Sequence, residues 1–141
     1  MEFLDKGFAV CVDGAYVKDG RLLLLKRRVE PFKGYWSLVG GHVDDNETLK
    51  EALRREFKEE TCLDVEVGDI IDVRLEKTFD RTKIIIVFQV ISAEGEIHLD
   101  SENEDYGWFT EIPANSVYIS LKYFDECLRN RFRSKKSQES C

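Results

Sequence analysis

Apolar and polar residues along the first forty positions fall into short runs of strand length. Two such runs, residues 9–17 and 21–26, are separated by Lys18-Asp19-Gly20. Because Asp-Gly between strand-like runs is a strong hairpin signal, we expect a β-hairpin here. The segment 31–34 then interrupts the pattern before a short strand around 36–39, which Gly40-Gly41 is expected to end.

The segment 47–61 predicts a helix. It consists of strong helix formers without glycine or proline, and Leu49, Ala52, Leu53 and Phe57 recur at helical spacing. The rest of the chain predicts strands at 65–75, 83–91 and 106–109, an acidic loop at 100–105, and a second helix from about residue 116. This order predicts one mixed α/β (α+β) domain over residues 1–141, with 134–141 as a flexible basic tail.

Three acids of the predicted helix lie on its apolar side. Since successive helix residues turn by ~100°, Glu56, Glu59 and Glu60 continue the apolar stripe at the C-terminal end of the helix. There they face one another and the negative end of the helix dipole, which calls for a compensating cation. Mg²⁺ and Mn²⁺ prefer such clustered carboxylates. Periodicity alone leaves open a second interpretation, in which these acids are solvated and pair with nearby bases.

The segment around this helix resembles a known motif. Residues 41–47, with Gly41 first and Glu47 last, seven further residues, and then Arg55-Glu56-Phe57-Lys58-Glu59-Glu60-Thr61-Cys62-Leu63 are similar to the Nudix box, G-x5-E-x7-R-E-U-x-E-E-x-G-U, where U is bulky and apolar. Every defined position agrees except Cys62, where the family has glycine. The chain therefore resembles the Nudix hydrolases.

The resemblance implies the Nudix fold, a mixed β-sheet sandwiched between helices, with the box forming a loop, a helix and a loop. It also implies that Glu56, Glu59 and Glu60 bind Mg²⁺ or Mn²⁺ together with the backbone at Gly41. Arg55 and Glu47 would orient these carboxylates without binding the metal themselves. Bound metal would neutralise the diphosphate and lower the pKa of the attacking water.

A general base must also lie within reach of that water. In the Nudix family it is a box glutamate or an acid on a later loop, so Glu102 and Glu104 are both candidates here. Glu102 is preferred, because relatives often carry an acid about six residues before the tryptophan that matches Trp108. A solvent-exposed acidic loop remains the alternative.

Three positions depart from the usual family pattern. At Cys62 a glycine would adopt a left-handed backbone just past the helix end, so the cysteine is expected to cost ~1 kcal/mol of stability or to require another cap. This departure concerns stability more than chemistry. Val39 and Asn46 replace a frequent proline and a frequent glycine, and neither is expected to bind metal.

The implied activity is hydrolysis of the diphosphate in a nucleoside diphosphate linked to another group. ADP-ribose or a similar nucleotide sugar is the first substrate considered, because residues 26–34 before Trp36 resemble ADP-ribose pyrophosphatases. Phe79, however, stands where those enzymes often have proline. A (d)NTP pyrophosphohydrolase that removes damaged nucleotides is the nearest alternative. A catalytically silent nucleotide-binding module is disfavoured because all the box acids are present.

Four aromatic residues are candidates for stacking on a nucleobase, although each also fits ordinary packing. They are Phe32, Tyr35, Phe79 and Tyr106.

Composition narrows the partners. The net charge of −7, from 28 acids against 21 bases, disfavours nucleic acid and RNA-end processing but is compatible with a small nucleotide that carries metal. No apolar run is long enough for a membrane span, and the first six residues do not resemble a secretory signal. The scattered cysteines contain no C-x-x-C pair. We therefore expect a cytoplasmic protein, and a homodimer is compatible with the sequence.

Overall fold

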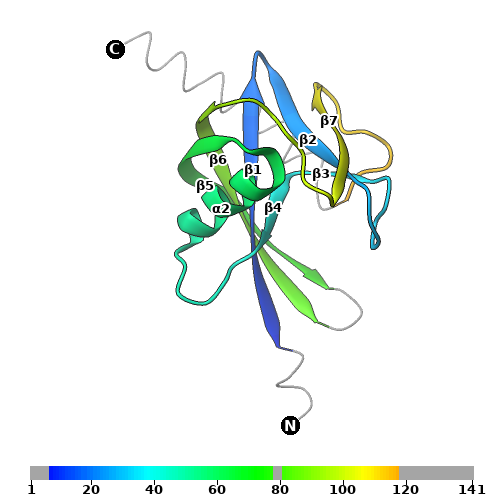
Figure 1. The fold of residues 1–141 in the computed structure, drawn as a ribbon. Helices are drawn as coiled ribbons and strands as arrows, with labels where there is room; N and C mark the ends of the chain where they lie inside the picture. Colours follow the sequence, from blue (N-terminus) through cyan, green and yellow to red (C-terminus); the bar gives the residue numbers. More distant parts are fainter. Residues whose placement is uncertain (1–6, 78–80, 118–141) are drawn as a thin grey trace.

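The computed structural model describes residues 7–77 and 81–117. Within these residues seven strands and one helix form a mixed α+β fold (Figure 1). The elements are β1 (Phe8–Lys18), β2 (Arg21–Arg27), β3 (Trp36–Ser37), β4 (Val39–His42), α2 (Leu49–Thr61), β5 (Asp64–Lys77), β6 (Thr82–Glu94) and β7 (Asn103–Phe109).

The sheet is built around β1. Its strand order is β3-β2-β1-β6-β5, with β4 paired to β1 and β7 paired to β2. β1 runs parallel to β6 along nearly its whole length. On its other edge β1 pairs with β4 over residues 11–14 and with β2 only at residues 17–18, so the two partners diverge along it. A cavity lined by residues of β4 lies where β4 and β2 separate.

The hairpin between β1 and β2 confirms the prediction from the Asp-Gly signal. Asp19 and Gly20 form its two-residue loop with φ of 53° and 75°. A type I′ turn requires positive φ at both central residues, and this turn matches the twist of the flanking strands. The sequence therefore determines the local register at which β2 leaves β1.

Helix α2 covers one face of the sheet (Figure 1). Its apolar residues Ala52, Leu53 and Phe57 are fully buried. A side chain at Gly14 of β1 would overlap the Phe57 ring, so this glycine allows the helix to approach the strand closely. A second apolar cluster occupies the opposite face of the sheet. The second predicted helix, from about residue 116, lies almost entirely outside the described residues.

The prediction of one strand over residues 36–39, ended by two glycines, was wrong. The chain forms two short strands: β3 pairs with β2, and β4 continues through Gly40 and Gly41 alongside β1. Neighbouring side chains pack directly against both glycines of β4, so there is no room for a Cβ at either position. A Cβ at Gly40 would overlap Asp13, and one at Gly41 would lie 2.6 Å from the Glu56 carboxyl carbon.

Strands β5 and β6 run one to three residues beyond their predicted ends, and two other boundaries differ for reasons that the structure shows. α2 begins at Leu49 and not at residue 47, because Thr48 and Glu51 form a capping box in which each side chain accepts a hydrogen bond from the other's backbone N–H. β7 begins at Asn103, within the predicted acidic loop. There its polar residues pair with the basic end of β2, at Lys26 and Arg27, which lets acidic residues continue the strand.

Cys62 ends α2 in the expected left-handed conformation. Its φ is 65° and its ψ is 9°, and its backbone N–H donates to the Lys58 carbonyl at 3.0 Å. Asn46, the other position where relatives often have glycine, has a φ of 71°. Both residues therefore occupy backbone positions that suit glycine.

Candidate active site

Arg55 joins the two halves of the box motif. From α2 its guanidinium reaches back to Glu47, with Nε to Oε2 at 2.7 Å and Nη2 to Oε1 at 3.1 Å. Nη2 also donates to the His42 carbonyl at 2.9 Å, and Nη1 lies 3.0 Å from Glu56 Oε1. A planar fork that binds two carboxylates and a carbonyl fixes the loop before α2 against the helix.

The charges in this clamp stabilise one another. The hydrogen bond to Glu47 is the largest cause of a raised pKa for Arg55. The same hydrogen bond, with a second from the Asp44 backbone N–H, lowers the pKa of Glu47. Glu47 is therefore ionised at neutral pH, and Arg55 places a fixed positive charge beside Glu56.

Glu56 and Glu60 lie between α2 and β4. Gly40 donates its backbone N–H to Glu60 Oε2 at 3.2 Å, and Asn103 Nδ2 approaches Glu60 Oε1 at 3.4 Å. The side chain of Glu56 is 14% exposed and packs over Gly41. The predicted helical face thus carries these two acids to the strand that contains Gly41, as the box motif implies.

Burial makes this pair of acids difficult to ionise together. It raises the pKa of Glu56, against the opposing effect of Arg55. It raises the pKa of Glu60 well above the usual value, and the negative charge of Glu56 adds to the increase. Two buried carboxyls that interact directly need a proton or a cation between them. A hard divalent cation fits this donor set in kind.

Glu59 takes a different position. Its side chain is 57% exposed and contacts Arg55 Nη1 at 3.3 Å. In the part of the chain that the structure describes, no three acidic, histidine or cysteine side chains are gathered as a ready metal site. Glu56 and Glu60 are therefore the members of the predicted set that already lie together, and Glu59 would have to turn away from Arg55 to join them.

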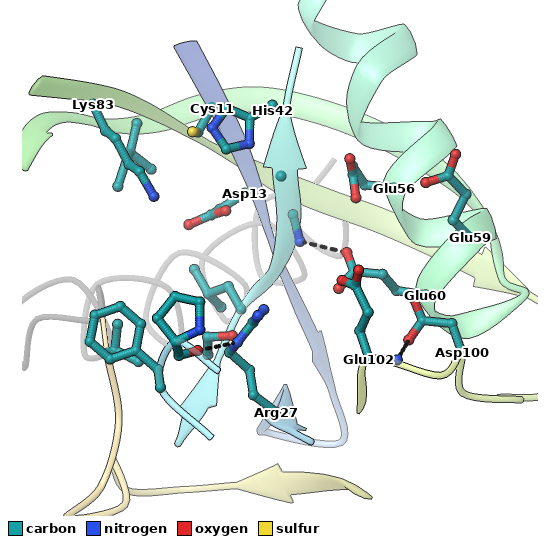
Figure 2. Close-up of a pocket in the computed structure, with 18 of the residues that line it drawn as sticks. Cys11, Asp13, Arg27, His42, Glu56, Glu59, Glu60, Lys83, Asp100 and Glu102 are labelled. Carbon is teal, nitrogen blue, oxygen red and sulfur yellow. Dashed lines mark hydrogen bonds between the residues drawn. The ribbon is translucent and has the colours of Figure 1, made fainter. Parts of the chain in front are cut away.

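A cavity of about 510 Å³ lies beside the acids of α2, and its lining includes Glu56, Glu59 and Glu60 (Figure 2). Its acidic wall also includes Asp100 and Glu102 from the loop before β7. Glu102 lies in the cavity lining, with its backbone N–H donating to Asp100 Oδ1 at 3.3 Å. Glu104 is not part of this lining, and its carboxylate lies 4.0 Å from Lys26 Nζ. The geometry therefore brings Glu102 rather than Glu104 toward the acids of α2.

The predicted aromatic residues differ in their position relative to the cavity. Phe32 lines the cavity. It lies on a loop that is held by a hydrogen bond from Arg27 Nε to the Pro31 carbonyl at 2.8 Å. Tyr35 contacts Phe32 edge to face, with ring centroids 5.9 Å apart, but does not line the cavity. Tyr106 lies on β7 outside the lining. Phe79 lies outside the described residues.

Sequence reasoning missed the part of the lining that lies on the other side of β4 from the acids. Cys11 and Asp13 of β1 and Lys83 of β6 lie there, with His42 beside them (Figure 2). Ile85 of β6 also lines the cavity. Burial raises the pKa of Asp13 to about 7. The available signal was a single charged residue inside the apolar run of β1.

A family model for the NUDIX domain matches residues 6–121. The chain belongs to the Nudix family. This Nudix protein is 36% identical over 109 residues to an ADP-ribose pyrophosphatase from Methanocaldococcus jannaschii, a match that covers 74% of the chain and 64% of that relative. It is 34% identical over 116 residues to the nucleoside triphosphatase NudI from Escherichia coli O139:H28, covering 73% of the chain and 81% of the relative. These names agree with the hydrolase class expected from the sequence.

A solved structure supports the fold assignment. The crystal structure of a MutT NUDIX hydrolase from Burkholderia pseudomallei superimposes on this Nudix protein with a TM-score of 0.77 at 27% identity, covering 84% of this chain and 96% of the other. The predicted Nudix fold is confirmed. Nudix hydrolases generally need a divalent metal, and the paired acids described above suit one. Within residues 7–77 and 81–117, no helix combines the length and the apolar composition needed to cross a membrane.

Proposed function

We propose that this Nudix protein is a metal-dependent pyrophosphohydrolase that cleaves the diphosphate of a nucleoside diphosphate linked to another group. The observation that carries the proposal is the arrangement of Glu56 and Glu60 on the wall of a 510 Å³ cavity, with Arg55 locked between Glu47 and Glu56. The volume suits a nucleotide derivative. The uncompensated acids suit a divalent cation, which an anionic diphosphate needs as a partner.

Mg²⁺ or Mn²⁺ is the proposed ion, since both prefer carboxylate and carbonyl oxygens. Glu56 and Glu60 would hold it with the backbone at Gly41, and Glu59 would join them from its exposed position. When bound, the ion neutralises the diphosphate oxygens and acidifies the attacking water. Arg55 and Glu47 act as positioning residues, because their hydrogen bonds keep Glu56 directed at the cavity.

Glu102 is the proposed general base. It lines the same cavity as Glu56 and lies on the loop facing α2, so it can accept a proton from water held near the acids (Figure 2). Replacing Glu102 with glutamine is expected to lower kcat by roughly 10²-fold. Glu104→Gln is the matched control, because Glu104 lies next to Lys26 and outside the lining. Equal kcat values for both variants would assign the base elsewhere.

ADP-ribose or a similar nucleotide sugar is the first proposed substrate. It is supported by the name of the Methanocaldococcus jannaschii relative and by the cavity, which extends from the acids of α2 to Phe32. A (d)NTP is the second candidate, supported by the name of the nucleoside triphosphatase relative. A catalytically silent module would be expected to have lost some of the acids that line this cavity.

One screen separates these candidates. Purified protein is incubated with ADP-ribose, other nucleotide sugars, dinucleotides and dNTPs, each with Mg²⁺ or Mn²⁺, and the products are identified by mass. A mononucleotide with a sugar phosphate supports the first candidate, and a mononucleotide with pyrophosphate supports the second. Binding of nucleotides without turnover of any of them would favour the silent module and would contradict the proposed activity.

A further inference from the structure

Asp13 is a charged residue inside a buried strand. It is the single charged side chain between Phe8 and Val17. It pairs with Gly40 of β4, where a side chain would overlap its carboxylate oxygen. The carboxylate therefore lies over the glycine and lines the cavity (Figure 2). An apolar residue would be less costly at a position that had only a packing role.

Nothing in residues 7–77 and 81–117 donates a hydrogen bond to this carboxylate. Two other acids of the cavity do have donors: Glu56 accepts from Arg55, and Glu60 accepts from the Gly40 backbone. Asp13 interacts only at a distance with Arg74, Lys83 and Glu56, and its burial raises its pKa to about 7. A half-buried carboxylate that lines a cavity without a donor can accept hydrogen bonds from a molecule bound there.

The position of Asp13 relative to the acids indicates which part of a substrate would reach it. Gly40, which lies under the Asp13 carboxylate, donates its backbone N–H to Glu60 Oε2 at 3.2 Å, so a single residue of β4 joins Asp13 to the acids of the proposed diphosphate site. Asp13 lines the same cavity as Glu56 and Glu60, and β4 lies between it and these acids in Figure 2. A substrate whose diphosphate lies at those acids would extend an adjoining group toward Asp13.

We propose that Asp13 accepts hydrogen bonds from the nucleoside of the substrate and thereby helps to determine specificity. This inference rests on the proposed function. A nucleoside offers paired donors either as the two ribose hydroxyls or as the N–H groups on the base, and a carboxylate accepts from both arrangements. The apolar Ile85 and Leu38, which line the same cavity, would contact the less polar faces of that nucleoside.

The test couples a change in the protein to a change in the substrate. Asp13→Asn and Asp13→Ala are compared with the parent on substrates that differ by one donor: ribose against 2′-deoxyribose, and guanine against hypoxanthine. The parent is expected to lose about 10-fold or more in kcat/KM when the recognised donor is removed, and Asp13→Ala should lose most of that discrimination. The donor that shows coupling identifies the sugar or the base as the contact.

Asp69→Asn is the matched control, because Asp69 is an exposed aspartate on β5 and lies outside the cavity. It should keep the parent's discrimination. Equal rate losses for all substrates in the Asp13 variants, or none, would overturn the inference while leaving the proposed function intact. So would a parent that does not discriminate, and this outcome does not depend on folding of the variants. A parent inert toward every substrate would overturn the proposed function, and this inference with it.

Discussion

Replacing Cys62 with glycine should stabilise the protein. Cys62 holds a φ of 65° at the end of α2, where a residue with a Cβ costs ~1 kcal/mol more than glycine. Glycine has greater freedom in the unfolded chain, which offsets ~0.5 kcal/mol of this gain. The side chain of Cys62 is exposed, so little packing is lost. The net expectation is a gain of ~0.5 kcal/mol, equivalent to ~2 °C in Tm for a chain of this size.

The assay is thermal and urea unfolding with chelator and reductant present. Cys62→Ala is the control, because it removes the thiol but keeps the Cβ that causes the strain. It should melt at or below the parent, whereas Cys62→Gly should melt above it. Catalytic rates should not change, since Cys62 does not line the cavity. A glycine variant that melts below the parent, or an alanine variant that gains as much, would refute the backbone explanation.

Two other predictions follow from the site. Arg55→Lys loses the fork that binds Glu47 and Glu56 together, so kcat/KM should decrease by roughly 10-fold to 100-fold in steady-state assays; an unchanged value would remove Arg55 from the positioning role. Burial raises the pKa of Asp13 from 3.8 to about 7. The positive charges of Arg74 and Lys83 oppose this increase, and the negative charge of Glu56 adds to it. The folded state therefore binds protons more tightly than the unfolded state. Stability of the metal-free protein should therefore increase as pH falls from about 8 to about 5, and Asp13→Asn should flatten that increase in urea titrations.

The β1–β2 hairpin and helix α2 were predictable because their determinants are local. Asp19-Gly20 adopts the backbone that its residue types favour, and the spacing of Phe57 with Glu56 and Glu60 follows from helix geometry alone. The family motif added Arg55 and Glu47, whose contact spans eight residues and cannot be read from periodicity. None of these features depends on how distant strands pair.

The wall that contains Asp13 depends on long-range pairing. Asp13 meets Gly40 across an antiparallel pair, and Lys83 arrives on β6, which runs parallel to β1. A one-residue change in either register would turn these side chains to the other face of the sheet. The same dependence explains the wrong boundary at β4, because nothing in the local sequence shows that Gly40 and Gly41 lie under Asp13 and Glu56.

The most direct test of the account compares Glu56→Gln and Glu60→Gln with Glu51→Gln. Glu51 lies on the solvent side of the same helix, and glutamine can keep its role in the capping box. With a substrate from the screen and saturating Mg²⁺, kcat/KM should decrease by roughly 10²-fold or more for Glu56→Gln and for Glu60→Gln, and should remain close to the parent for Glu51→Gln. Equal kcat/KM values for all three variants would contradict the claim that Glu56 and Glu60 form the catalytic metal site.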